Sequence, residues 1–193
     1  MTINILGYNI DNMKKELITN QKTNIQEFRL PRYSEIPNVG LYLEQVAKYI
    51  NGYFGPIRCM ELTPSMISNY VKKGIIDNPI KKLYYAEQIA YLFFIAVAKC
   101  VLSIENINVI IKMQKEVYGS QKAYDYFCDE FEHRLAAVFA MEYAAPIGIE
   151  ENKKVKSMLQ SVLFAAAHMI YLNDQFADVI SEGKQEVTET KEK

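Results

Sequence analysis

The residues that could do chemistry in this chain gather between positions 63 and 83. Thr63 is a favourable N-cap and Pro64 suits the first helical position, so we expect a short helix that Gly74 ends. Helical spacing turns four apolar residues to one face: Met66, Ile67, Tyr70 and Val71. The other face then carries hydroxyl, amide and ammonium groups, from Ser65, Ser68, Asn69, Lys72 and Lys73.

These polar groups are of the kinds that bind nucleic acid. Each lysine that neutralises a phosphate adds roughly 0.9 to the salt dependence of binding on B-DNA, and such contacts position a protein without reading sequence. Recognition of the base sequence would depend on Ser65, Ser68 and Asn69. An Asn side chain can pair bidentately with adenine, which favours the correct base over the wrong one by about 1–3 kcal/mol.

A second pair of lysines, Lys81 and Lys82, follows a turn signal at residues 77–79. Short extended segments at residues 75–76 and 83–85 flank the turn and predict a small hairpin wing. The sequence therefore predicts one surface that combines the 63–74 helix with the 77–83 wing. Its candidate nucleic-acid-binding residues are Ser65, Ser68, Asn69, Tyr70, Lys72, Lys73, Lys81 and Lys82.

Each of these residues also has an ordinary structural interpretation. Two lysines at a helix C-terminus favour the helix dipole, and Lys81 with Lys82 could form a solvated turn. Asn69 could cap or brace the wing locally. Tyr70 could belong to the core rather than stack on a base.

An apolar scaffold is expected around this segment. Residues 42–51 have the apolar spacing of a helix, which Gly52 is expected to end. Residues 86–101 are apolar on nearly every side, which predicts the central helix of the lobe. Ser103 is expected to cap a further helix.

The N-terminal part carries weaker signals. Residues 4–20 show loosely helical apolar spacing and predict a short helix. Residues 30–37 contain two prolines and predict an extended arm, from which Arg32 could reach a neighbouring DNA groove.

Two longer helices are expected after Gly119, over residues 121–143 and 152–180. In the second, apolar residues recur at alternating steps of three and four, and further apolar residues widen the stripe. A stripe this wide predicts packing against the first helix and also against a second chain. The candidate dimerisation residues are Val155, Met158, Val162, Met169, Leu172 and Phe176.

Two further expectations concern the C-terminal part of the chain. An apolar pocket between them could hold a small-molecule effector, although an ordinary core explains the same residues. Residues 182–193 are charged and lack large apolar side chains apart from Val187, which predicts a disordered tail.

Composition narrows the class of protein. The 193 residues have a formal net charge of −1, but residues 1–119 carry +4 and residues 120–193 carry −5, which fits one half that faces nucleic acid. The three cysteines form no CxxC pair, so reduced thiols are expected rather than a disulfide framework or zinc site. No secretory signal is evident and the most apolar run, residues 89–98, is too short to span a bilayer, so we expect a cytoplasmic protein without membrane contact.

The sequence contains little that would support catalysis. Glu130 and His133 have the Glu-x-x-His spacing of di-iron bundles, but His168 lacks the matching acidic residue three positions earlier. Phosphate-binding glycine loops, nucleophile elbows and zinc-protease motifs are missing from the sequence. We therefore expect neither an enzyme nor a metal or other cofactor.

The order of the expected elements resembles the winged helix-turn-helix of MerR-type regulators. The matching stretches are residues 42–47 for the first helix, 65–76 for the recognition helix and wing, 84–90 for the third helix and 103–107 for the fourth. In that family the second helix enters the major groove and the wing touches the DNA backbone. Asn69 stands where those proteins usually carry an arginine, so the phosphate contacts are not carried over.

A closer resemblance, over about residues 30–112, is to the bacterial family called domain of unknown function 1836, the YkrK-like proteins. It is carried by Leu-Pro-Arg-Tyr-Ser-Glu-Ile-Pro at residues 30–37, by Leu-Tyr at 41–42 and by Met-Ile-Ser-Asn-Tyr-Val-Lys at 66–72.

We therefore predict a mainly all-α protein with a small β wing, in four parts. They are an N-terminal helix and linker (1–29), a MerR-like winged helix-turn-helix (30–118), a helical dimerisation or sensing region (119–181) and the tail (182–193). The expected function is a DNA-binding transcriptional regulator, a homodimer on double-stranded, palindromic operator DNA. The alternative is a helical protein–protein interaction module that uses the same scaffold without binding DNA.

Overall fold

The computed structural model of this chain shows a mainly helical protein, as predicted. It describes residues 25, 27–57, 60–140 and 153–189, with only the backbone for 153 and 176–189, so the helix predicted at residues 4–20 lies outside the described residues. The helices are α2 (Leu43–Phe54), α3 (Pro64–Lys72), α4 (Ala86–Ala98), α5 (Ile104–Val117), α6 (Ser120–Ala140) and α7 (Lys153–Glu189). A two-stranded sheet pairs β1 (Leu41–Tyr42) with β2 (Leu83–Tyr84), and Tyr33–Glu35 form the 3-10 helix η1.

Helix α4 is the centre of the core, as its apolar sequence predicts, although it ends at Ala98 rather than at residue 101. Phe93 on this helix has no exposed surface. Its ring lies 5.7 to 6.0 Å from four other aromatic rings, which belong to Tyr49, Tyr53, Phe54 and Tyr124. Because three of these come from α2 and one from α6, Phe93 joins α2 and α6 in one core.

Helix α2 continues through Gly52, so the predicted end at that glycine is wrong. The continuation places Phe54 in the core, where its ring stacks on Phe28 with centroids 6.3 Å apart. Asn51 on the same helix exchanges two hydrogen bonds of 2.9 Å with the backbone of Leu62. This pair of bonds holds the start of α3 against α2.

The predicted hairpin of residues 75–76 with residues 83–85 is wrong. Ile75 and Ile76 are buried, and their amides donate to the carbonyl of Tyr70 at 3.0 and 3.5 Å, so they close the end of α3. The strand β2 pairs instead with β1, with Tyr42 opposite Leu83. Burial of the two isoleucines decides the difference, because a strand in a solvated hairpin would expose them.

The predicted extended arm is an ordered strap on α6. The Arg32 guanidinium donates to both carboxylate oxygens of Glu132 at 2.7 and 2.8 Å, and the Leu30 amide donates to the same carboxylate at 2.7 Å. The amide of Tyr33 donates to Asp125 at 2.8 Å. Arg32 is therefore engaged within the chain, and its suggested reach to a DNA groove is wrong.

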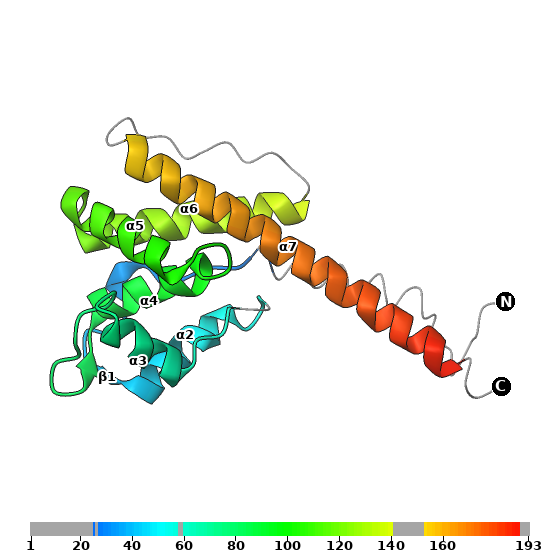
Figure 1. Cartoon of the computed structure of the whole chain (residues 1–193), viewed down its shortest axis with the longest axis horizontal. Coiled ribbons are helices and arrows are strands. Elements are labelled where there is room, and N and C mark those ends of the chain that lie inside the picture. The colour runs from blue at the N-terminus through cyan, green and yellow to red at the C-terminus, as the bar shows by residue number, and fades with distance from the viewer. Residues whose placement is uncertain (1–24, 26, 58–59, 141–152, 190–193) are drawn as a thin grey trace.

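Helix α7 packs along α6, as predicted, and Figure 1 shows its C-terminal half projecting past the other helices. The side that packs inward carries Leu163, Ala166 and Ile170, all buried. The helix continues to Glu189, so residues 182–189 are helical rather than part of a disordered tail, and residues 190–193 lie outside the described residues. Within α7, Lys154–Gln175 is long and apolar enough to cross a membrane by length and composition alone, a property that core helices share.

Candidate nucleic-acid interface

The outer face of α3 is polar, as its sequence predicts. Thr63 caps the helix by accepting a hydrogen bond from the Met66 amide at 3.2 Å, and Gly74 ends the segment with a φ of +68°. The polar side chains of this helix and its C-cap are exposed or half-exposed: Ser65, Ser68, Asn69, Lys72 and Lys73. The helix therefore presents hydrogen-bonding groups and ammonium groups to solvent without interruption.

Tyr70 does not belong to this face. Its side chain is 6 % exposed, and burial raises the pKa of its phenol above the ordinary value. The ordinary interpretation, that Tyr70 packs in the core, is correct, and stacking on a base is ruled out in this conformation. The reason is its position near Ile67, which has no exposed surface, on the inward face of α3.

Lys81 and Lys82 form the tip of a two-residue turn. The Leu83 amide donates to the Ile80 carbonyl at 2.9 Å, and the Ile80 amide donates back to the Leu83 carbonyl at 3.0 Å. Both lysines have left-handed backbone conformations, with φ of 50° and 68°. Turns of this shape favour Asn and Gly, and a residue held in such a region costs about 1–3 kcal/mol and often marks a functional site.

The lysine turn and α3 lie on connected parts of the lobe. Lys82 is followed by Leu83, which pairs with Tyr42 in the sheet. Leu43, the next residue after Tyr42, lines a shallow hollow together with residues of α3. The hollow has a volume of about 420 Å³, and its other walls are Pro64, Ser65, Ser68, Asn69 and Lys72. Figure 1 shows α3 and β1 together at the end of the molecule away from α6 and α7.

The charges of this surface are partly balanced. Lys73 forms an ion pair with Glu105 on α5, with Nζ and Oε1 3.8 Å apart. Within the described parts of the chain, no ion pair engages Lys72, Lys81 or Lys82. Lys72 on α3 and the two lysines of the turn are therefore the cations of these two elements best placed to meet a phosphate.

The predicted dimerisation stripe divides into two. Val162 is 7 % exposed and packs inside the chain, so its assignment to a dimer surface is wrong, while Val155 is half-buried at the pocket that α5 and α6 also line. Met169 and Leu172 are 40 % and 46 % exposed. With Met158, they form an outer apolar face. Phe164, which the heptad pattern did not select, is also exposed, but its ring lies 5.7 Å from the Arg134 guanidinium of α6. The Phe176 side chain lies outside the described residues.

The structure also places Glu130 and His133, whose spacing in the sequence lends little support to a metal site, and the expected apolar pocket. Glu130 is buried and pairs with Arg134, with Oε1 and Nε 2.5 Å apart, while His133 is exposed. Across the described residues, no three His, Cys, Asp or Glu side chains are grouped to hold a metal ion. The apolar pocket exists, but α4 and α5 form walls of it as well as α6 and α7, which the pattern of the last two helices could not indicate.

Comparison with known proteins identifies the family to which this chain belongs. No curated protein and no solved structure matches the chain. A family model described as domain of unknown function (DUF1836) matches residues 31–127. The match covers the strap, the α2–α3 lobe and the start of α6, which is more than half of the 193 residues. The chain therefore belongs to the DUF1836 family.

Proposed function

We propose that this protein is a DNA-binding transcriptional regulator that acts as a homodimer on a palindromic operator in the cytoplasm. The observation that carries the proposal is the outer face of α3, a helix capped at both ends whose fully exposed side chains all carry hydroxyl, amide or ammonium groups. In this proposal α2 and α3 form a MerR-like helix-turn-helix, and the Lys81–Lys82 turn is its wing.

The groups of this face divide by role. Ser65, Ser68 and Asn69 would reach base edges in the major groove, where an Asn side chain pairs with adenine. Lys72 near the end of α3 and the two turn lysines would contact phosphates and set the register. The strained backbone of the turn supports this role, because a solvated turn without a function gains nothing from left-handed lysines.

A single lobe of this size buries too little surface for tight specific binding. A second copy would cover the outer face of α7, where Met158, Met169 and Leu172 are exposed. Such a dimer would present two α3 helices to half-sites about 34–36 Å apart, one turn of DNA.

Selection of binding sites from random DNA, followed by affinity measurements at several salt concentrations, tests the proposal. The variant Lys72→Ala/Lys81→Ala/Lys82→Ala is expected to weaken binding and to lower the salt slope by roughly 0.9 for each phosphate that the variant no longer neutralises. Lys112→Ala, which removes an exposed lysine from α5, is the matched control. Equal affinity and slope for the triple variant and the wild type would remove this surface from the proposal.

One observation favours a second candidate, a protein-interaction module. The hollow beside α3 is bordered by Leu43 and Pro64 as well as by polar groups, and Glu105 balances Lys73 nearby. A stoichiometric protein partner whose binding is abolished by Ser68→Arg, together with no salt-dependent DNA binding, would establish this candidate instead.

A further inference from the structure

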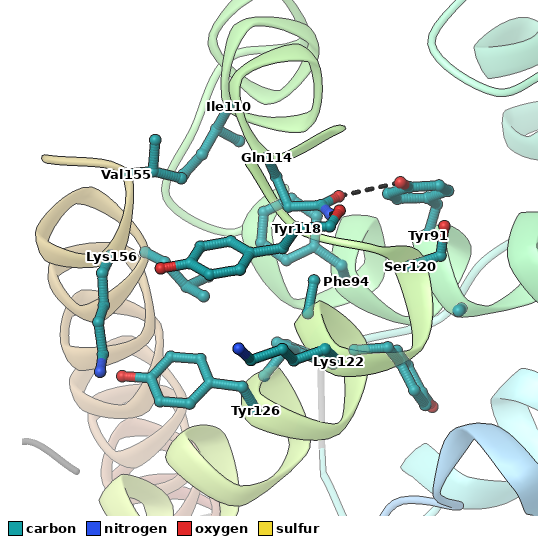
Figure 2. Close-up of a pocket in the computed structure, with 15 residues that line it drawn as sticks. Tyr91, Phe94, Ile110, Gln114, Tyr118, Ser120, Lys122, Tyr126, Val155 and Lys156 are labelled. Atoms are coloured by element: carbon teal, nitrogen blue, oxygen red, sulfur yellow. Dashed lines mark hydrogen bonds between the residues drawn. The ribbon is translucent and has the colours of Figure 1, made fainter. Parts of the chain in front are cut away.

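A cavity with an almost wholly apolar surface lies between α4, α5, α6 and α7. Its volume is about 120 Å³, and Figure 2 shows side chains from all four helices around it. Its apolar walls include Phe94, Ile110, Phe127, Val155 and Leu159. An apolar cavity of about 150 Å³ in another protein binds benzene, so the size of this one suits a ligand with a single ring.

Polar side chains at the edge of the cavity are bonded to other groups of the protein. The Tyr91 hydroxyl donates to Gln114 Oε1 at 2.9 Å, and the Gln114 side-chain amide donates to the Tyr118 carbonyl at 2.8 Å. The Ser120 hydroxyl donates to a carboxylate oxygen of Glu87. A water molecule needs about two to four polar partners to be held in a cavity, and these groups leave few for it.

Two further tyrosines of the lining also direct their hydroxyls to the protein. The Tyr126 hydroxyl accepts a hydrogen bond from Gln160 Nε2 at 2.9 Å. The Tyr124 hydroxyl is buried near Cys128, which does not line the cavity. The ring of Tyr124 therefore borders the cavity, and its polar end does not.

The two lysines of the lining lie against aromatic rings. The ammonium group of Lys122 is 5.5 Å from the centre of the Tyr118 ring, and that of Lys156 is 4.8 Å from the centre of the Tyr126 ring. The faces of these rings attract the ammonium groups. An anion that entered the cavity would lose its hydration among apolar walls. The chemistry of the cavity therefore favours a neutral ligand over a charged one.

We propose that this cavity is a binding site for a small, neutral, apolar molecule of about one aromatic ring. Phe94 of α4 and Phe127 of α6 offer it aromatic partners, and the aliphatic side chains of α5 and α7 enclose it. Such a ligand gains its affinity from apolar contact, and every polar group that it passes already has another environment.

The ligand would also hold α7 to the rest of the protein. Val155 and Leu159 are one helical turn apart on α7, and both line the cavity, opposite walls that belong to α4, α5 and α6. A molecule that touches them adds contacts between α7 and those helices. Since the outer face of α7 is the proposed contact with a second copy, the ligand would act as an effector of the dimer. This regulatory part rests on the proposed function, whereas the binding site does not.

Fluorine NMR titration of the full-length protein with fluorobenzene and with 4-fluorobenzoate tests the site without DNA. Fluorobenzene is expected to bind at least about tenfold more tightly, because the carboxylate of the other compound must lose its hydration. Ala123→Leu, which fills the cavity, should abolish binding of fluorobenzene. The matched control is Ala136→Leu, the same change at a half-buried position of α6 outside the lining, and it should keep the binding. The site is overturned if the wild type does not bind fluorobenzene, if Ala123→Leu binds it equally well, or if the carboxylate binds as tightly.

A second variant keeps the test decisive if Ala123→Leu does not fold. Leu159→Ala removes part of one wall and should enlarge the cavity. We expect this variant to bind 1-fluoronaphthalene, which has two fused rings, about tenfold more tightly than the wild type does. Unchanged affinity for the larger compound would show that these ligands do not bind in this cavity.

Hydrogen exchange of α7 amides tests the effect of the ligand on that helix. Fluorobenzene at saturation should slow the exchange of residues 159–163 about twofold or more in the wild type, and it should not do so in Ala123→Leu. Unchanged exchange in the wild type would overturn the effect on α7 while leaving the site. Failure of DNA binding alone would overturn only the proposed function, because neither measurement depends on it.

Discussion

Helices α3 and α7 both leave one whole face uncovered, and the two faces have opposite chemistry. The fully exposed side chains of α3 are all polar or cationic, whereas those on the outer face of α7 include Met158, Met169 and Leu172. A hydrated polyanion suits the first face, since its phosphates replace the water around ammonium groups. The second gains free energy only when another apolar surface covers it.

The difference follows from how each helix places its apolar residues. Helix α3 is short, and two of its inward residues, Ile67 and Tyr70, are both buried in the core. Helix α7 has apolar residues on more than one side, so that one side packs on α6 and the other remains uncovered. Exposed apolar residues that gather on one side of a helix commonly mark an interaction site, which is why α7 is the better candidate for contact with a second copy.

Disrupting the outer face of α7 should have the largest effect. Met169→Asp/Leu172→Asp is expected to give a folded monomer whose affinity for operator DNA falls by about 10²–10⁴-fold, because the two lobes are no longer linked. Light scattering gives the mass, and mobility shift gives the affinity. Val109→Asp on α5, which changes an exposed apolar residue elsewhere, is the control. A dimer that survives the double substitution would show that α7 is not its interface.

Disrupting the strap should affect both faces together, because one core supports them. Glu132→Ala is expected to lower the free energy of unfolding by about 3–5 kcal/mol, since Arg32 and the Leu30 amide are left without a buried partner. Asp129→Ala removes a more exposed carboxylate that also contacts Arg32, at 2.9 Å, and should cost less than about 1 kcal/mol. Urea denaturation measures both. Similar losses of stability for the two variants would contradict a special role for the buried carboxylate.

Removing the backbone strain of the lysine turn should have the smallest effect on stability. It should also show whether the turn lysines serve DNA binding at the expense of stability. Lys81→Asn/Lys82→Gly supplies the residues that the turn shape favours and is expected to raise the free energy of unfolding by about 1 kcal/mol. DNA affinity should fall at the same time. A gain in stability with unchanged affinity would show that the turn lysines serve no binding role.

Local signals in the sequence predict the elements around α3 well. Thr63, Pro64 and Gly74 act within one turn of the helix ends, so spacing alone is enough to place the boundaries and the exposed face. The same is true of Ser103, which caps α5 by accepting from the Asn106 amide at 3.2 Å. Capping and amphipathic spacing depend on neighbours in the chain, and the sequence contains that information directly.

Three of the failures share a different cause, which is that a distant partner decides the outcome. Gly52 does not end α2, because the contacts of Phe54 with Phe28 and Phe93 stabilise the helix beyond that glycine. Residues 75–76 do not form a strand, because the core accepts both isoleucines. Arg32 is not available for DNA, because it is bound by Glu132, a hundred positions along the chain.

The order of apolar and polar residues is sufficient to establish a helical chain, a short helix with one polar face and a long helix with more apolar residues than one neighbour can cover. The partner of β2, the strap on α6 and the cavity among four helices emerge only when remote segments meet in three dimensions. The physical reason is the distance along the chain over which each interaction acts. Backbone propensity and capping act over a few residues, whereas burial, ion pairing and cavity shape depend on which surfaces the whole core brings together.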